Sequence, residues 1–212
     1  MPFKLNILIA LCFGLLAAGC VFWKQGENDK QYVDSELTSS EAEFIVAGGC
    51  FWCVEADFDK VDGVLATISG YTGGDVDNPT YKQVSNTDTG HYEAVRIVYD
   101  PSVVSYEELL DYYWRHVDPT DAGGQFCDRG DSYRTAVFVA DEEERKLAEA
   151  SKTEIEQSGV LPGDVVTPIL DAKTFWPAEN YHQNYYQTHP IRYTYYRNAC
   201  GRDGRIKEVW GK

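Results

Sequence analysis

A short apolar run, two glycines, a cysteine and two aromatic residues follow one another at positions 44–53, Phe-Ile-Val-Ala-Gly-Gly-Cys-Phe-Trp-Cys. This order predicts a strand, a glycine turn and a helix that starts beside Cys50. The first N–H groups of a helix have no partner within it, and the positive end of the helix dipole favours an anion there. We therefore expect Cys50 to have a lowered pKa and to act as a nucleophile. Phe51 and Trp52 add apolar surface, which indicates thiol chemistry on an apolar or soft substrate.

Length, charge and motif content exclude several classes of function. The 212 residues suffice for one hydrophobic core, so we expect a single domain and a monomer. The formal net charge of −15 argues against a nucleic-acid partner, because phosphate binding needs a basic surface. The sequence has no glycine-rich dinucleotide fingerprint and no cluster of metal ligands, so it predicts no cofactor.

The first twenty residues are typical of an export signal. The apolar run at 5–16 is too short for a comfortable membrane span, but it has the length of the apolar part of a secretory signal peptide. Small residues then precede Cys20, as in a bacterial lipobox, whose cysteine is lipidated. Ala17 stands where a larger aliphatic residue is more usual, so simple cleavage remains the alternative. We predict an exported protein, either periplasmic or held at a membrane only by an N-terminal lipid.

Residues 21–41 are polar and lack sustained periodicity, which is typical of a flexible tether. Residues 42–212 then form the folded domain. Four cysteines remain in this domain: Cys50, Cys53, Cys127 and Cys200. Because export permits disulfides, redox cycling of these thiols requires a dedicated reductant.

Apolar alternation and turn residues predict a domain in which strands and helices alternate. Strands are predicted at 43–47, 64–71, 91–99, 134–140 and 165–170. Helices are predicted at 51–60, 105–117, 142–158 and 177–187, with a last helical segment around Cys200. A capping box of Ser105 and Glu108 opens the second of these helices. We expect an α/β (α+β) fold, a single two-layer domain with a mixed sheet covered by helices. Two long loops, 76–90 and 118–131, are expected to be functional.

Four sequence blocks resemble those of the peptide-methionine sulfoxide reductase A family and occur in that family's order. The first is Gly-Cys-Phe-Trp at 49–52, followed by Glu55. The others lie at 78–81 with 89–95, at 128–135 and at 175–183. The resemblance implies reduction of the S epimer of methionine sulfoxide, free or in proteins. It also implies a cysteine sulfenic acid, then a disulfide that a thioredoxin-like protein reduces.

The resemblance makes Cys50 the nucleophile that attacks the sulfoxide sulfur. The oxygen must leave as water, so the site needs a proton donor, and this role falls to Glu93. A carboxyl group beside Phe51 and Trp52 would be desolvated and would stay protonated. From strand alternation alone, Glu93 could equally be a residue that faces the solvent.

The same resemblance assigns Tyr81 and Tyr133 as hydrogen-bond donors to the sulfoxide oxygen. Asp128 would orient its loop, contact the substrate or hold a water, although an aspartate of this kind also commonly forms turns.

Phe51 and Trp52 resemble the family's cradle for the substrate methyl group, with core packing as the alternative. His182 and Tyr185 would line the main-chain side of the substrate, although a helix rich in aromatic residues also suits a core.

The identity of the resolving thiol stays open. Many relatives carry another residue at the position of Cys53 and place recycling cysteines in a mobile tail, whereas the segment around Cys200 is charged and helical in pattern. We rank Cys53 first, because it lies three residues after Cys50 on the same helix. Cys200 follows as a C-terminal candidate, and Cys127 is third because it adjoins Asp128.

Two other classes of protein fit parts of the sequence. A thioredoxin-like disulfide oxidoreductase would use the Cys50–Cys53 motif, with Thr167-Pro168 as its proline element. That chemistry leaves Glu93 and Tyr81 without a role. A zinc-binding module would use Cys50 and Cys53 with distant ligands such as Cys127 and His182, but zinc sites usually show a second paired motif.

Overall fold

A computed structural model describes residues 37–211 of the chain. The predicted signal peptide, the lipidation candidate Cys20 and residues 21–36 of the predicted tether lie outside the described residues. Within residues 37–211, no helix combines the length and the apolar character needed to cross a membrane.

One six-stranded sheet forms the centre of the domain, in the strand order β7-β6-β1-β3-β2-β8. Neighbouring strands are antiparallel except β6 and β7, which run parallel, so the predicted mixed sheet is confirmed. The strands are β1 (Ala42–Gly48), β2 (Val64–Thr72), β3 (Tyr92–Tyr99), β6 (Thr135–Val139), β7 (Ile169–Asp171) and β8 (Trp176–Pro177). A separate two-stranded ribbon pairs β4 (Gly124–Gln125) with β5 (Asp128–Arg129).

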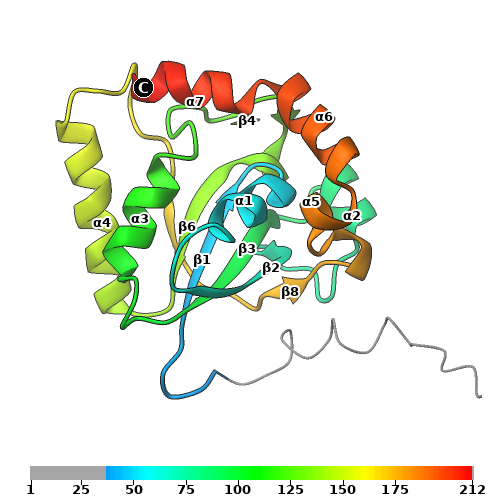
Figure 1. Ribbon diagram of the computed structural model, residues 1–212, viewed down its shortest axis with the longest axis horizontal. Coiled ribbons are helices and arrows are strands. Elements are labelled where there is room, and N and C mark those ends of the chain that lie inside the picture. The colour runs from blue at the N-terminus through cyan, green and yellow to red at the C-terminus, as the bar shows by residue number, and fades with distance from the viewer. Residues whose placement is uncertain (1–36, 212) are drawn as a thin grey trace, which may run out of the picture.

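Seven helices surround the sheet in the described part of the chain. They are α1 (Phe51–Phe58), α2 (Tyr81–Asn86), α3 (Tyr106–Trp114), α4 (Glu142–Gln157), α5 (Tyr185–Thr188), α6 (Pro190–Cys200) and α7 (Arg202–Trp210). Figure 1 shows α1 crossing the sheet, α3 and α4 beside it, and α6 with α7 along one end. The capping box predicted for α3 is present, since the Ser105 hydroxyl accepts from Glu108 N and Ser105 N donates to the Glu108 carboxylate.

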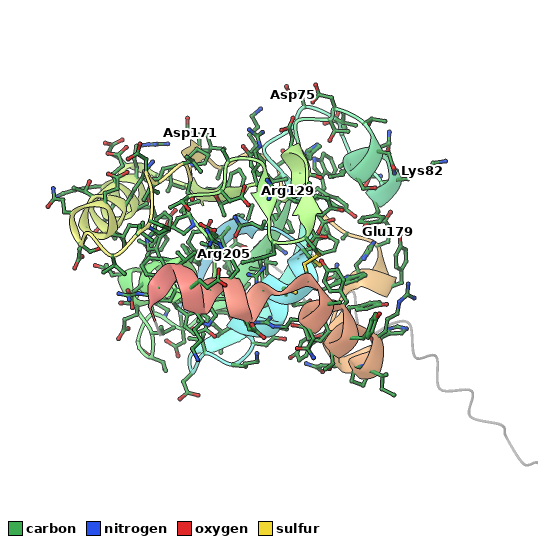
Figure 2. All side chains as sticks on the ribbon, turned by 90° about the horizontal axis from the view of Figure 1, so that it is seen from above. Asp75, Lys82, Arg129, Asp171, Glu179 and Arg205 are labelled. Carbon is green, nitrogen blue, oxygen red and sulfur yellow. A yellow bond between two sulfur atoms is a disulfide. The ribbon has the colours of Figure 1, made fainter. Side chains whose placement is uncertain are left out.

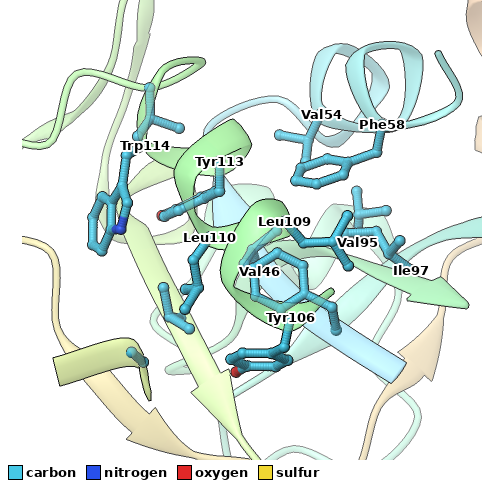
Figure 3. Close-up of a cluster of buried hydrophobic side chains, with 14 of the residues drawn as sticks. Val46, Val54, Phe58, Val95, Ile97, Tyr106, Leu109, Leu110, Tyr113 and Trp114 are labelled. Atoms are coloured by element: carbon cyan, nitrogen blue, oxygen red, sulfur yellow. The ribbon is translucent and has the colours of Figure 1, made fainter. Parts of the chain in front are cut away.

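The main core lies between one face of the sheet and helices α1, α3 and α4. Alternate residues of β3, Val95 and Ile97, point to this face and pack with Phe58 and Leu109 (Figure 3). A smaller cluster, which includes Ala94 and Phe138, covers the opposite face. Because successive strand residues point to opposite faces, Glu93 shares the face of Val95 and therefore lies beneath α1. Charged side chains such as Asp75 and Asp171 project outward instead (Figure 2).

Four sequence predictions of secondary structure were wrong. The predicted loop at 118–131 contains the β4–β5 ribbon. The predicted loop at 76–90 contains α2, which Thr80 and Gln83 open with a capping box. The strand predicted at 165–170 is confined to β7. The helix predicted at 177–187 is replaced by β8, a 3₁₀ turn (Asn180–His182) and α5. The side-chain amide of Gln183 bonds the backbone N–H and C=O of Ser69, which holds this segment against β2 in an irregular conformation.

Gly49 must remain a glycine for the nucleophile to keep its position. Its φ is +82°, and an added Cβ would lie 2.6 Å from the Cβ of Gln125. Gln125 cannot give way easily, because it is fully buried and its amide bonds the backbone N–H and C=O of Asp118. We expect Gly49→Ala to lower the free energy of unfolding by about 2–5 kcal/mol, from backbone strain and overpacking.

Urea unfolding checks this prediction, with Gly163→Ala as the matched control. An added Cβ at Gly163 meets its nearest neighbour, Thr120, at an ordinary 3.8 Å. The control is expected to change the free energy of unfolding by less than about 1 kcal/mol. Equal effects of the two substitutions would contradict the prediction.

Candidate active site

Cys50 lies where the sequence predicts, at the N-cap of α1 directly after β1 and the glycine turn. Its carbonyl accepts the N–H of Cys53 at 3.0 Å, which closes the first turn. The Cys50 side chain is 7% exposed and opens into a pocket of about 60 Å³. The side chains that line this pocket come from α1, α2, β3, β5, the 3₁₀ turn Asp131–Tyr133 and α6: Cys50, Phe51, Trp52, Tyr81, Glu93, Asp128, Tyr133 and Tyr196.

The pocket therefore brings together seven residues that the sequence predicts for the site, from five separate elements. Apolar rings and polar hydroxyl and carboxyl groups face the same small space. Such a pocket can hold a small, partly polar group such as a sulfoxide with its methyl carbon.

The prediction of a lowered pKa for Cys50 is wrong for the substrate-free site. Burial raises the pKa of the Cys50 thiol well above its usual value, and the neighbouring Cys53 and Glu93 raise it further. The helix N-terminus does not compensate, because the free N–H of Phe51 donates to the Glu93 carboxyl at 3.1 Å. Cys50 is consequently a protonated thiol before the substrate binds.

Glu93 is a buried acid, as predicted. It is 2% exposed, and burial raises its pKa to about 8, with the charge of Asp128 as a smaller cause. The hydrogen bonds from Phe51 N and Tyr133 act in the opposite direction and do not overcome this shift. Glu93 is therefore protonated at neutral pH and has a proton to give.

Tyr81 and Tyr133 line the same pocket and interact with each other through their hydroxyl groups. Burial raises the pKa of both phenols, so both stay protonated and able to donate. Glu179 fixes the start of α2, because its carboxylate accepts the Tyr81 N–H at 2.9 Å and the Tyr71 hydroxyl at 2.9 Å. Glu179, from the sequence block at 175–183, thus positions Tyr81, from the block at 78–81.

His182 and Tyr185 are not among the residues that line the pocket; they lie against Trp52 instead. The Trp52 indole N–H donates to His182 Nδ1 at 3.1 Å, and the Tyr185 ring stacks on the indole at 3.8 Å with an angle of 7° between the planes. Both side chains are buried. They hold Trp52 in position, and their predicted contact with the substrate main chain stays a prediction.

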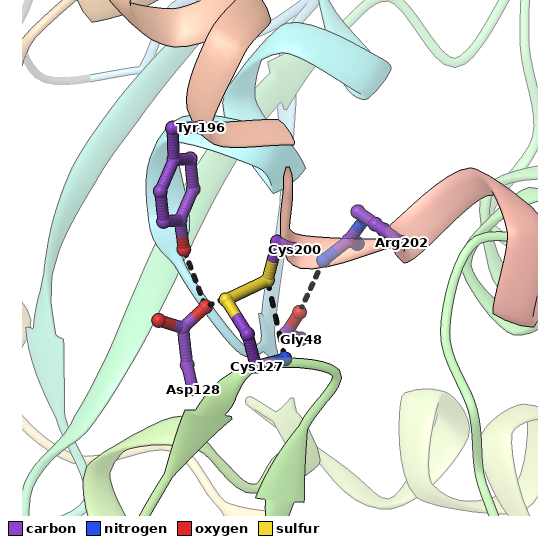
Figure 4. The surroundings of a disulfide bond; sticks show 6 residues. All are labelled: Gly48, Cys127, Asp128, Tyr196, Cys200 and Arg202. Carbon is purple, nitrogen blue, oxygen red and sulfur yellow. Dashed lines mark hydrogen bonds between the residues drawn. A yellow bond between two sulfur atoms is a disulfide. The ribbon is translucent and has the colours of Figure 1, made fainter. Parts of the chain in front are cut away.

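The four cysteines of the described residues divide into two pairs. Cys127 and Cys200 form a disulfide that joins the β4–β5 ribbon to the end of α6 (Figure 4). Cys50 and Cys53 are free, buried and in contact through their side chains. Cys53 is therefore the thiol beside Cys50. This position agrees with its first rank among the candidates for the resolving thiol.

The family described as "Peptide methionine sulfoxide reductase" matches residues 42–212. The chain is 53% identical to "Peptide methionine sulfoxide reductase MsrA" of Bacillus licheniformis, over 78% of this chain and 92% of the relative. It is 54% identical to "Peptide methionine sulfoxide reductase MsrA 2" of Caulobacter vibrioides, over 79% and 84% of the two chains.

The chain belongs to the peptide methionine sulfoxide reductase family. Its fold is also that of solved structures: Mxr1 from Saccharomyces cerevisiae in reduced form has a TM-score of 0.69 at 29% identity, covering 74% of this chain and 90% of that one. Methionine sulfoxide reductase A of Corynebacterium diphtheriae has a TM-score of 0.64 at 30% identity, over 73% and 77% of the chains. The predicted family, enzyme class and thiol-dependent reduction of methionine sulfoxide are confirmed.

In this peptide methionine sulfoxide reductase, Cys53 lies near three charged side chains, Asp57, Arg197 and Arg202. Asp57, one turn further along α1, pairs with Arg197 at 2.9 Å and lies 3.7 Å from Arg202. Arg202 is 2% exposed and donates to the carbonyls of Gly48 and His116 at 3.0 and 2.8 Å. A hydrogen bond from Cys50 and the charges of the two arginines lower the pKa of Cys53.

The alternative zinc set is not assembled in the described part of the chain. The one group there that offers three closely spaced His, Cys, Asp or Glu ligand atoms is Cys127, Asp128 and Cys200, and two of these atoms are the disulfide sulfurs.

Sequence reasoning missed Tyr196, Arg202 and Asp57. Their contacts form because α6 and α7 pack near α1, and the local periodicity of the sequence does not reveal this packing. A usable signal existed for Tyr196, because it lies one helical turn before Cys200 on a segment whose pattern is helical.

Proposed function

We propose that this protein reduces the S epimer of methionine sulfoxide to methionine, with Cys50 as nucleophile and Glu93 as general acid. The observation that carries the proposal is the position of the buried Glu93 carboxyl, whose pKa burial raises to about 8, in the same 60 Å³ pocket as the Cys50 thiol. A sulfoxide is reduced by a thiol only when its oxygen is protonated or strongly hydrogen-bonded, and the pocket supplies both kinds of donor.

In the first step, the Cys50 sulfur attacks the sulfoxide sulfur while Glu93 gives its proton to the oxygen. Tyr81 and Tyr133 donate hydrogen bonds as charge develops on that oxygen. The oxygen then passes to Cys50 as a sulfenic acid, and methionine leaves. Two electrons move from the cysteine sulfur to the substrate sulfur. The rings of Phe51 and Trp52, which line the same pocket, would receive the substrate methyl group.

In the second step, Cys53 attacks the sulfenic sulfur of Cys50, a disulfide forms and the oxygen leaves as water. Two features support this choice. Cys53 is the free thiol beside Cys50, and its lowered pKa favours the thiolate, which is the form that attacks. Cys127 and Cys200 are bonded to each other in this state.

A thioredoxin-like protein would then reduce the Cys50–Cys53 disulfide. Mxr1 from Saccharomyces cerevisiae has been solved in complex with Trx2, and the same redox chemistry suits this site. The sequence before the domain supports a role outside the cytoplasm, in the repair of oxidised methionine in exported proteins. Mass analysis of the mature N-terminus distinguishes a lipidated Cys20 from simple cleavage.

The test of the proposed function is turnover of separated methionine sulfoxide epimers by the full chain and by Cys50→Ser. We expect the protein to reduce the S epimer and to leave the R epimer unchanged, and we expect the variant to reduce neither. Equal rates on both epimers would contradict the stereochemical proposal. Full activity of Cys50→Ser would contradict the assignment of the nucleophile.

A further inference from the structure

Tyr196 is a pocket residue that has no role in the reaction described so far. It lies on α6, and its hydroxyl donates a short hydrogen bond to Asp128 Oδ2 (Figure 4). Tyr196 and Cys50 line the same pocket, and the Tyr196 hydroxyl interacts with the Cys50 side chain. Tyr196 thus links the nucleophile to the carboxylate of Asp128, which lines the same pocket.

The chemistry of the first step leaves one proton without a destination. Cys50 is a protonated thiol before attack, because its burial raises its pKa. Glu93 starts protonated and acts as the acid in this step, so it is not the base that takes the thiol proton as the sulfur attacks. A second carboxylate within reach of the sulfur is therefore required, or an equivalent base.

We propose that Tyr196 and Asp128 form a proton relay that accepts the thiol proton of Cys50 as its sulfur attacks the sulfoxide. The inference rests on the proposed function, because it takes Cys50 as the nucleophile. The S–H bond of Cys50 breaks and its proton passes to the Tyr196 oxygen, while the Tyr196 hydroxyl proton passes to Asp128 Oδ2. The thiol's electron pair forms the new bond to the substrate sulfur, and the relay itself is neither oxidised nor reduced.

Burial makes Asp128 suitable as the final acceptor, because it raises the pKa of this carboxyl and so makes it a stronger base. Asp128 is also only partly buried, so it can return the proton to the solvent after each turnover. Two carboxyl groups in one pocket then have opposite roles: Glu93 starts protonated and gives a proton, and Asp128 starts ionised and takes one.

Cys53 is the competing acceptor, since it also contacts Cys50 and has a lowered pKa. Two observations favour the tyrosine route. Cys53 is 2% exposed, so a proton placed on it has no direct path to water. Cys53 must also be a thiolate to attack the sulfenic acid in the next step, and taking the proton would neutralise it.

The fold holds both members of the relay in place. The Cys127–Cys200 disulfide links the residue before Asp128 to the end of the helix that carries Tyr196. The Tyr196 ring also packs edge-on against Trp52, with ring centroids 5.8 Å apart. Tyr196→Phe preserves this packing and removes only the hydroxyl, which makes it the informative substitution.

The experiment measures methionine formed in a single turnover of reduced protein with the S epimer. Tyr196→Phe is expected to slow this step about 10²-fold at neutral pH. Asp128→Asn is expected to have a similar effect, and the double variant to be no slower than either single one, because both remove the same relay. Tyr195→Phe, whose side chain is 76% exposed on the same helix, is the matched control and should keep the full rate.

The pH profile separates a relay from a structural role. Raising the pH increases the small fraction of Cys50 that is already a thiolate, and a thiolate needs no proton acceptor. The ratio of the wild-type rate to the Tyr196→Phe rate should therefore fall as the pH rises from about 6 to about 9.

A ratio that stays constant with pH, or a Tyr196→Phe variant at the wild-type rate, would overturn the relay. Loss of the first step in Cys53→Ser would assign the proton to Cys53. Activity without Cys50 would instead refute the proposed function itself.

Discussion

Glu93→Gln is expected to lower the single-turnover rate of methionine formation by about 10²–10⁴-fold, the range for loss of a general acid. The amide is nearly the same shape and can still accept the N–H of Phe51, which the carboxyl accepts at 3.1 Å. It has no proton to give to the sulfoxide oxygen. The loss should therefore fall on the chemical step rather than on folding, which circular dichroism and urea unfolding check.

The pH dependence of the wild-type rate follows from the same carboxyl group. With a pKa of about 8, Glu93 is protonated below pH 8 and loses its proton above it. The rate should thus decline above about pH 8, and Glu93→Gln should not show this decline.

Glu55→Gln is the matched control for this substitution. Glu55 is also fully buried and has a pKa raised to about 8, but it accepts the N–H of Asn184 and does not line the pocket. The Glu55→Gln rate should stay near that of the wild type and decline at the same pH. A comparable loss of rate in both variants would contradict the assignment of the acid to Glu93.

Cys53→Ser is expected to separate the two halves of the reaction. The variant should release one equivalent of methionine at the wild-type rate, because Cys50 and Glu93 are intact. Steady-state turnover with a thioredoxin system should then fall by at least about 10²-fold, since no thiol remains beside Cys50 to displace the sulfenic oxygen. Rapid-quench measurement of the first turnover and a steady-state assay provide the two rates.

Peptide mapping of the oxidised wild-type protein completes this test. The expected bond joins Cys50 to Cys53, with Cys127 still bonded to Cys200. A bond from Cys50 to Cys127 or Cys200, with Cys53 free, would show that a different thiol resolves the sulfenic acid. Full steady-state turnover of Cys53→Ser would also show that a thiol other than Cys53 resolves the sulfenic acid.

The strand, glycine turn and helix around Cys50 were predictable because each is a local property of the sequence. The α3 capping box was predictable for the same reason, and the mixed sheet followed from the alternation of strands and helices along the chain. Strand alternation placed Glu93 on one face of β3 with Val95 and Ile97. Alternation did not predict that α1 covers this face, because that is a tertiary property. The prediction that Glu93 is a buried acid therefore depended on the family resemblance.

The pKa of Cys50 shows where local reasoning fails. A helix N-terminus favours an anion, but here the available N–H is used by Glu93 and the sulfur is buried. Desolvation then outweighs the helix dipole, whose effect is at most about 2 kcal/mol. The Cys127–Cys200 disulfide was equally inaccessible to local reasoning, because it depends on the packing of α6 near the β4–β5 ribbon.

One labelling experiment addresses the role of Cys50 directly. Reduced Cys53→Ser protein is mixed with one equivalent of the S epimer in the presence of dimedone, which reacts with sulfenic acids, and the adduct is located by peptide mass analysis. A single adduct on Cys50, formed in step with methionine, is the predicted result. Methionine formation with the adduct on another residue, or with Cys50 left as a free thiol, would contradict it.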